Sequence, residues 1–177
     1  MKGRLCKIVC VLLVGVLLPS AARGENSFLQ NCKETVSTTW KEGRWELIVP
    51  VRTWHNRANY THEQIDRYNE EPWGLGIAKT YTDERANRHR LLALSFQDSF
   101  NKPEPTLGYS WQAVWRVDRT IRPTLGFALG VTLRDSYNWI PLPAAIPIIG
   151  VDIGPFSMET TYLIGFDVLF GWVTLRF

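Results

Sequence analysis

Three side chains with the chemistry for acyl transfer lie at the ends of two apolar, strand-like segments. His55 follows the run VRTW, and Asp98 and Ser99 follow the run LSFQ. Acyl transfer needs a nucleophile or an activated acceptor, a base whose pKa lies near neutrality, and a group that orients this base. Functional sites often lie where a regular segment gives way to a loop. His55, Asp98 and Ser99 are therefore a candidate catalytic group, provided that the fold brings them together.

Spacing alone also permits an ordinary structural role for each of these residues. A single histidine at a strand end is by default a surface residue, and an Asp-Ser pair is by default part of a turn. His62 and His89 compete with His55 for the role of base. The three histidines lack the neighbouring Cys or carboxylate spacing of a zinc site, so we expect neither a metal nor a cofactor.

The segments that would position these residues have the length and pattern of β-strands. Short β-type segments follow one another from Trp45 to the end of the chain, separated by Gly, Pro, Asn and Asp. Most are close to the roughly 9–11 residues of a tilted membrane-spanning strand. We expect eight strands, at residues 45–54, 73–82, 89–97, 107–117, 121–133, 146–153, 155–163 and 169–177.

Two of these segments alternate in a way that distinguishes an outer face from an inner face. The last segment places on one face the residues Gly171, Val173, Leu175 and Phe177. Segment 121–133 carries large apolar residues on one face and small or polar ones on the other, which are Arg122, Thr124, Gly126, Ala128, Gly130 and Thr132. Small residues on an inner face predict a barrel interior with room for a ligand.

The segment before the strands has a different period. In residues 26–42 the side chains of Phe28, Cys32, Val36 and Trp40 recur every four positions, which predicts an amphipathic helix. Such a helix packs on a soluble core or lies at a membrane surface, and a barrel in a membrane favours the second. We therefore expect a helix at 25–43 on the periplasmic side, followed by a barrel at 45–177.

The first residues have the features of an export signal. Residues 1–24 combine a basic start, an apolar run from Ile8 to Leu18 and the small residues 20–22, which predicts a secretory signal peptide. Of the twenty Lys and Arg residues, four lie in this segment, which leaves sixteen against seventeen acidic residues. The mature chain, residues 25–177, is thus about neutral, and no nucleic-acid partner is expected.

The fold class that combines these features is all-β: an eight-stranded antiparallel outer-membrane β-barrel preceded by an N-terminal amphipathic helix. A soluble lipocalin-like barrel has the same number of strands, but it should not carry apolar residues on both surfaces or end in a stripe that includes Phe177. The sequence therefore favours the membrane barrel.

Prolines interrupt several of the expected strands. Pro50 lies inside the first, Pro72 opens the second, and Pro141, Pro143 and Pro147 lie before or inside the sixth. Proline cannot donate to a strand ladder, so pairing should be weakened there. Ordinary turns account for Pro141 and Pro143. At Pro50, Pro72 and Pro147 we expect gaps through which a lipid enters the barrel from the side.

Much of the chain resembles the lipid A palmitoyltransferases of Gram-negative outer membranes, the PagP family. The residues that carry the resemblance are IVPVRTWHNRANY, DRYNEEPWG, FQDSFNK and GYSW, followed by LGFALGVTLRD and NWIPLP. The resemblance implies a monomeric eight-stranded barrel in the outer membrane, with its active site facing the extracellular leaflet. It also implies transfer of a palmitoyl chain from the sn-1 position of a glycerophospholipid to a hydroxyacyl chain of lipid A.

The resemblance also assigns roles to individual residues. The catalytic His, Asp and Ser of the family match His55, Asp98 and Ser99. His55 would be the general base, Asp98 would orient or charge it, and Ser99 would be the nucleophile or a polar stabiliser. In the family, a small residue of the GYSW stretch forms the floor of the acyl-chain pocket. Here this residue is Ser110, and its side chain predicts a chain shorter than palmitate.

The same sequence features are compatible with two other functions. One is a catalytically silent barrel with a structural or resistance role. The other is an outer-membrane phospholipase, in which water takes the place of the acceptor. The chain also departs from the family at Ile164, where a proline is usual, and in the short loop GFDV, residues 165–168. These departures concern how lipids enter the barrel.

Overall fold

The computed structural model describes residues 25–117 and 120–177. The expected export signal, residues 1–24, lies outside the described residues. Helix α2 spans Glu25–Glu42, as its four-residue periodicity predicted. No helix within 25–117 or 120–177 is long and apolar enough to cross a membrane. Residues from Thr35 onward form one compact unit, which contains the whole barrel.

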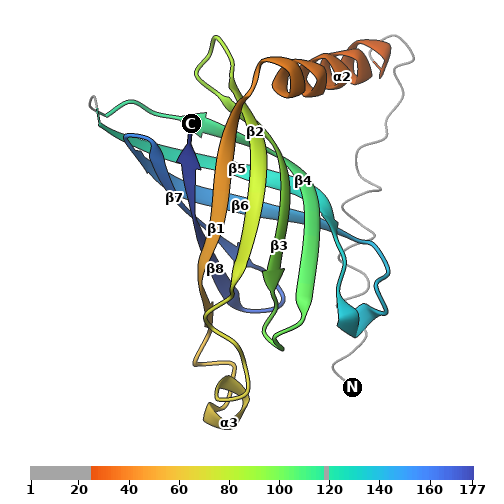
Figure 1. Cartoon of the computed structure of the whole chain (residues 1–177), viewed down its shortest axis with the longest axis vertical. Coiled ribbons are helices and arrows are strands. Elements are labelled where there is room, and N and C mark those ends of the chain that lie inside the picture. Colours follow the sequence, from red (N-terminus) through yellow and green to blue (C-terminus); the bar gives the residue numbers. More distant parts are fainter. Residues whose placement is uncertain (1–24, 118–119) are drawn as a thin grey trace. The chain divides into compact units, whose positions relative to one another are not determined.

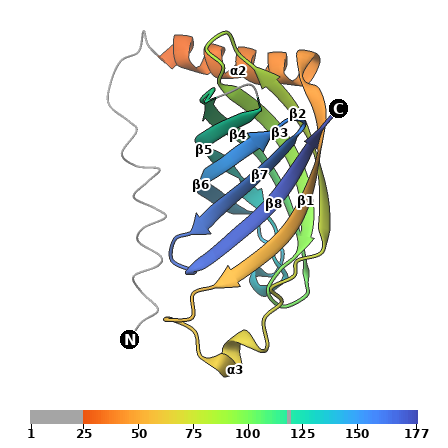
Figure 2. The same cartoon turned by 90° about the vertical axis from the view of Figure 1, so that its left-hand side faces the viewer.

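Eight antiparallel strands form a closed barrel, in which each strand pairs with its neighbours in the sequence and β1 pairs with β8. Figures 1 and 2 show the strands tilted around the barrel wall. The strands are β1 (Arg44–His55), β2 (Gly74–Thr82), β3 (Arg88–Gln97), β4 (Pro103–Val114), β5 (Ile121–Thr132), β6 (Leu142–Ile153), β7 (Phe156–Leu163) and β8 (Val168–Arg176). The expected fold class is confirmed. Short helices α3 (His62–Ile65) and η1 (Asp135–Tyr137) lie in two connections.

Strand alternation separates an apolar outer face from a mixed interior. On β5 the side chains of Leu125, Phe127, Leu129 and Val131 are 40–49% exposed, whereas Thr124 is buried. This is the inner and outer assignment that the sequence pattern predicted for this strand. The buried apolar core consists of Ile48, Ala78, Ile148, Phe170 and Trp172.

Two strands begin four residues earlier than the sequence predicted, at 103 where 107 was expected and at 142 where 146 was expected, and both of these added stretches contain proline. β4 begins at Pro103 and β6 at Leu142, so Pro143, which we assigned to a turn, lies inside a strand. Residues 142–148 of β6 pair with β5, whereas the pairing of β6 with β7 covers only residues 149–153. A strand tolerates proline where one of its edges has no partner, since no ladder hydrogen bond is lost there.

The two ends of the barrel differ. At the end that we call the loop end, the strands are joined by residues 56–73, 98–102, 133–141 and 164–167. At the opposite end, the terminal end, β1 begins and β8 ends, and two of the connections are the short segments 83–87 and 154–155. Figure 1 shows α3 beyond the loop end and the C-terminus at the terminal end.

Candidate active site at the loop end

A β-bulge turns His55 toward the barrel interior. Pro50 pairs with Trp172 and Arg52 with Gly171, so the ladder between β1 and β8 shifts by one residue between them. Before the bulge the buried residues are Glu46, Ile48 and Pro50, and after it they are Thr53 and His55. Without the extra residue, strict alternation would place His55 on the outer face. As a result of the bulge, His55 is only 2% exposed.

The structure brings His55 and Ser99 together across the loop end. His55 Nε2 lies 3.0 Å from Ser99 Oγ, which is hydrogen-bonding distance. The backbone N–H of Asn69 donates to the carbonyl of Ser99 at 2.8 Å, and this bond ties the connection 56–73 to the connection 98–102. A buried imidazole and a serine hydroxyl thus share a hydrogen bond at one mouth of the barrel.

Asp98 is also at the loop end, where its carboxylate shapes the turn that carries Ser99. Asp98 Oδ1 accepts hydrogen bonds from the backbone N–H groups of Phe100, at 2.8 Å, and Lys102, at 2.9 Å. The side chain is only 4% exposed. Within residues 25–117 and 120–177, no hydrogen bond joins Asp98 to His55.

A carboxylate that the sequence did not single out lies against the other side of the imidazole. Glu70 Oε1 lies 3.1 Å from His55 Nδ1 and accepts the backbone N–H of His55 at 3.0 Å. The guanidinium of Arg57 donates to both oxygens of Glu70, with both distances at 2.6 Å. Arg57 also donates to the carbonyl of His55 at 3.0 Å, so the three residues form one connected cluster.

Aromatic rings surround the imidazole. Tyr68 stacks on His55 with the ring centroids 4.7 Å apart, and Tyr60 meets His55 edge-on at 5.4 Å. Phe100 packs edge-on against Tyr68 at 5.5 Å. The Tyr60 hydroxyl donates to the carbonyl of Phe166, which links the connection 56–73 to the short connection 164–167. These contacts fix the ring plane of His55.

The ion pair with Arg57 keeps Glu70 charged well into the acidic range. Hydrogen bonds from Arg57, with smaller contributions from His55, lower the pKa of Glu70 from its ordinary value of 4.5 to about 2, although burial acts in the opposite direction. A carboxyl whose folded pKa is depressed stabilises the fold above its unfolded pKa, and this stabilisation is lost as the pH falls through the folded pKa. The cluster should therefore persist from neutral pH through pH 4.5 and break as the pH approaches about 2.

Replacing Arg57 by glutamine should move the pKa of Glu70 up toward 4.5, because the main cause of its depression is removed. A titration of the Glu70 side-chain carboxyl carbon by NMR measures this directly. Arg67→Gln is the matched control, since Arg67 is an exposed arginine of the same connection. An unchanged titration of Glu70 in Arg57→Gln would contradict the assigned ion pair.

The three prolines expected at lateral gaps lie beside incomplete strand pairing. The ladder between β1 and β2 ends at Ile48 and Gly76, just before Pro50, whereas β1 continues to pair with β8 as far as His55. Pro72 lies in the connection that follows this unpaired part of β1. Pro147 lies in the part of β6 that has no β7 partner. Both interruptions open toward the loop end.

Ser110 lies inside the barrel between two layers of side chains. One is the buried apolar core that includes Ile48 and Ile148, and the other, which we call the ionic layer, is the group of charged and polar side chains around Glu159. It is fully buried and pairs in the sheet with Arg90 on β3 and Ala128 on β5. One inward position closer to the loop end lies Gly108, and one position closer to the terminal end lies the buried Gln112. The Ser110 hydroxyl has no hydrogen-bond partner within the described residues.

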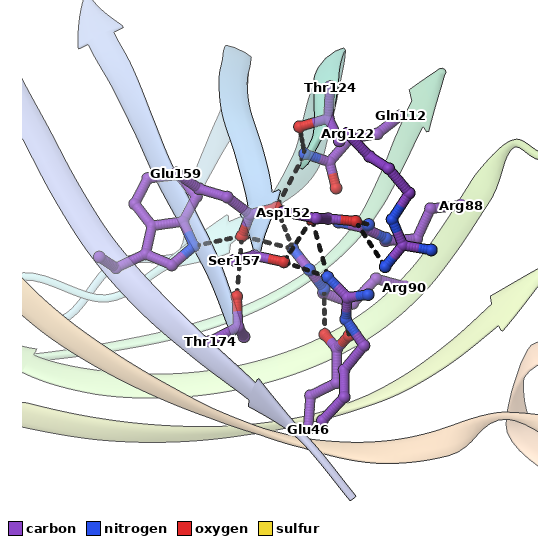
Figure 3. Close-up of polar contacts among 12 residues, drawn as sticks. Glu46, Arg88, Arg90, Gln112, Arg122, Thr124, Asp152, Ser157, Glu159 and Thr174 are labelled. Atoms are coloured by element: carbon purple, nitrogen blue, oxygen red, sulfur yellow. Dashed lines mark hydrogen bonds and ion pairs between the residues drawn. The ribbon is translucent and has the colours of Figure 1, made fainter. Parts of the chain in front are cut away.

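The ionic layer lies in the barrel interior toward the terminal end, and Figure 3 shows the polar contacts among its residues. Glu159 on β7 is its hub: it accepts hydrogen bonds from Arg90 at 2.9 Å, Gln112 at 2.8 Å and the indole N–H of Trp172 at 2.7 Å. Arg90 also donates to Glu46 at 2.8 Å. Further members of the layer are Arg88, Arg122, Thr124, Asp152, Ser157, Thr174 and Arg176.

His62 and His89, the alternative bases, lie away from Ser99. His62 is exposed at the start of α3. His89 lies at the start of β3, near the terminal end, where it contacts Tyr109 at 2.7 Å and Asp83 at 3.2 Å. No group of three or more potential metal ligands occurs within residues 25–117 and 120–177.

The fold and the site define a small barrel with an apolar outer wall and, at one mouth, a buried histidine within hydrogen-bonding distance of a half-buried serine. A family model described as "Antimicrobial peptide resistance and lipid A acylation protein PagP" matches residues 35–174. The chain belongs to this family.

Among curated relatives, the lipid A acyltransferase PagP of Laribacter hongkongensis (strain HLHK9) is 44% identical over 150 residues, which cover 82% of this chain and 73% of the relative. The lipid A palmitoyltransferase PagP of Escherichia coli O6:K15:H31 (strain 536 / UPEC) is 40% identical, with 86% of each chain covered. Among solved structures, the Yersinia pestis outer membrane protein Ail aligns with a TM-score of 0.35 and 12% identity, over 76% of this chain and 99% of that one. A likeness this distant supports no statement about function.

Proposed function

We propose that this chain is an outer-membrane enzyme that transfers a palmitoyl-type acyl chain from the sn-1 position of a glycerophospholipid to a hydroxyacyl chain of lipid A. The observation that carries the proposal is the hydrogen bond between the buried His55 and Ser99, at one mouth of a barrel whose next interior layer is apolar. Membership of the PagP family and the names of the relatives support the same reaction.

In the proposed reaction, His55 acts as the general base. The lipid A hydroxyl attacks the carbonyl carbon of the sn-1 ester, and His55 Nε2 takes up the hydroxyl proton as the new carbon–oxygen bond forms. Ser99 donates a hydrogen bond to the carbonyl oxygen as this oxygen becomes negative. The bond to the glycerol oxygen then breaks, and the proton on His55 passes to this oxygen to give a lysophospholipid. Asp98 contributes by holding the turn that presents Ser99.

The proposed orientation places the loop end at the extracellular leaflet. Bacterial outer-membrane barrels have short periplasmic turns and longer extracellular loops. The connections 56–73 and 133–141 at the loop end exceed the turns 83–87 and 154–155 at the terminal end. In this orientation both interruptions of strand pairing, at Pro50 with Pro72 and at Pro147, face outer-leaflet lipids, which supports lateral lipid access there. The ladder closes within a single chain, which supports a monomer.

Mass spectrometry of lipid A from cells with and without this protein tests the reaction. After chelation of surface divalent cations, lipid A from expressing cells should gain the mass of one acyl chain. If the barrel is correctly inserted in the membrane and the mass of lipid A does not change, the proposal is overturned. If free fatty acid is released and lipid A gains no chain, the protein is a phospholipase. If neither acylated lipid A nor free fatty acid forms, it is a catalytically silent barrel.

Ser110→Gly should lengthen the acyl chain that the enzyme prefers. The side chain of Ser110 projects into the interior where the apolar layer meets the ionic layer, so its removal deepens the space for a chain. Each additional buried methylene is worth about 0.8 kcal/mol, which is roughly a fourfold preference. The measurement is the distribution of products from a series of phospholipids that differ in sn-1 chain length.

Ser95→Gly is the control for this prediction, because Ser95 is an exposed serine on the outer face of β3. It should leave the chain-length distribution unchanged. A distribution for Ser110→Gly that matches the parent protein would show that Ser110 does not limit the length of the chain.

A further inference from the structure

The imidazole of His55 has an oxygen at each of its two nitrogens, and these oxygens differ in what they can do. Ser99 Oγ lies 3.0 Å from Nε2, and Glu70 Oε1 lies 3.1 Å from Nδ1. A hydroxyl can donate or accept a hydrogen bond, whereas an ionised carboxylate can only accept. The carboxylate therefore selects the tautomer of the neutral imidazole that carries its hydrogen on Nδ1. Nε2 is then left with a lone pair, directed at the hydroxyl of Ser99.

Glu70 is held in this position from several sides. Arg57 binds both carboxylate oxygens at 2.6 Å, and the backbone N–H of His55 donates to Oε1 at 3.0 Å. The backbone carbonyl of Glu70 accepts from Thr53 at 3.0 Å, which fixes the chain on which the side chain stands. The Glu70 side chain is 11% exposed, so little water competes for these bonds. A bidentate arginine of this kind fixes the plane of a carboxylate as well as its charge.

The carboxylate of Asp98 serves a different purpose. Its Oδ1 accepts hydrogen bonds from two backbone N–H groups of its own turn, those of Phe100 and Lys102. These bonds shape the loop that presents Ser99, and they leave Glu70 as the acid in contact with Nδ1.

We infer that Glu70 is the positioning residue that orients His55 and fixes its tautomer, and that Arg57 holds Glu70 in place for this role. The inference rests on the proposed function, since it assigns the partner of the proposed base. In the reaction, the imidazole that has gained a proton on Nε2 is positively charged, and the negative charge of Glu70 stabilises it. Arg57 keeps the proton on the imidazole and off the carboxylate.

The first test is Glu70→Gln in the full-length protein, assayed with phospholipid donor and lipid A acceptor. Glutamine keeps the size of the side chain, but it is neutral and its amide nitrogen donates, so the selection of the tautomer is lost. We expect kcat to fall by about 10²–10⁴-fold, the range over which acid–base groups and their orienting carboxylates act, with KM changed by less than about threefold. Glu71→Gln is the matched control, because Glu71 is the adjacent acid, is 82% exposed and, among the described residues, forms an ion pair only with the exposed Arg52.

The second test reads the tautomer directly and does not depend on a variant. Nitrogen-15 NMR of the parent protein with labelled histidine should find His55 with its hydrogen on Nδ1 at neutral pH. Glu70→Gln should reduce the fraction of this tautomer, whereas Asp98→Asn should leave it unchanged. A parent protein with the hydrogen on Nε2, or a Glu70→Gln variant with parental kcat, would overturn the assignment of Glu70.

The failure of this inference differs from failure of the proposed function. If His55→Ala abolishes transfer while Glu70→Gln is fully active, the acyltransferase stands and Glu70 has no positioning role. If the parent protein adds no chain to lipid A, the proposed function fails, whatever tautomer His55 adopts.

Discussion

His55→Ala should reduce the rate of acyl transfer to lipid A by about 10²–10⁴-fold, the usual contribution of a general base. The physical reason is the position of Nε2, which is 3.0 Å from Ser99 Oγ and is the only ring nitrogen of His55 not facing a carboxylate. Alanine removes the proton acceptor and leaves Ser99 and Glu70 in place. The measurement is the initial rate of acyl transfer from a radiolabelled phospholipid to lipid A with purified protein in detergent.

His62→Ala provides the matched control for this experiment. His62 is an exposed histidine at the loop end, and its imidazole is not joined by a hydrogen bond to Ser99. Both variants should retain the altered gel migration that a folded barrel has before heating. A His55→Ala protein that folds and transfers acyl chains at the parental rate would exclude His55 as the base.

Glu159→Gln should lower the free energy of unfolding by about 3–5 kcal/mol, the cost of removing one partner from a buried ion pair. Glu159 is 3% exposed and accepts hydrogen bonds from Arg90, Gln112, Trp172 and Thr174. Glutamine has the same size, but it leaves the buried guanidinium of Arg90 with Glu46 as its only charged partner within residues 25–117 and 120–177. Urea unfolding of the barrel in lipid vesicles, followed by tryptophan fluorescence, measures the difference.

Glu63→Gln makes the same chemical change at an exposed position of α3 and should alter the free energy of unfolding by less than about 0.5 kcal/mol. A loss below about 1 kcal/mol for Glu159→Gln would mean that the ionic layer contributes little to stability. Because Glu159 lies away from His55 and Ser99, the folded variant should still transfer acyl chains.

Most of the fold could be predicted from the sequence, because the barrel wall imposes a simple physical pattern. Outward residues such as Leu125 and Leu129 face an apolar surrounding, and the inward residues between them are small or polar. The β-type segments and the turn residues between them located all eight strands, alternation predicted the two faces of the fifth and the last, and the four-residue period predicted α2. The starts of β4 and β6 were placed too late: the expected fourth strand began after Pro103, and Pro143 was assigned to a turn. Their tolerance inside a strand depends on which neighbour pairs there, and the sequence does not contain this information.

The site was less accessible to sequence reasoning. Residue types and positions at strand ends made His55 and Ser99 candidates, and the resemblance to the PagP family assigned them catalytic roles. The structure brings these two residues into hydrogen-bonding distance. Nothing in the spacing indicated the bulge at Pro50 that turns His55 inward. Nothing separated Glu70 from the adjacent Glu71 either, since the two differ only in how the connection 56–73 folds back over β1. Polar contacts between loops depend on the path of each loop, which no periodicity describes.

The ionic layer also has a consequence for the membrane that holds this barrel. Side chains from β1, β3, β4, β6, β7 and β8 meet in the interior toward the terminal end and bond to one another. Because these side chains bond to one another inside the barrel, we expect them to hinder the passage of water and ions between the apolar interior near the loop end and the terminal end. A cell could insert many copies without making its outer envelope leaky to ions or small solutes.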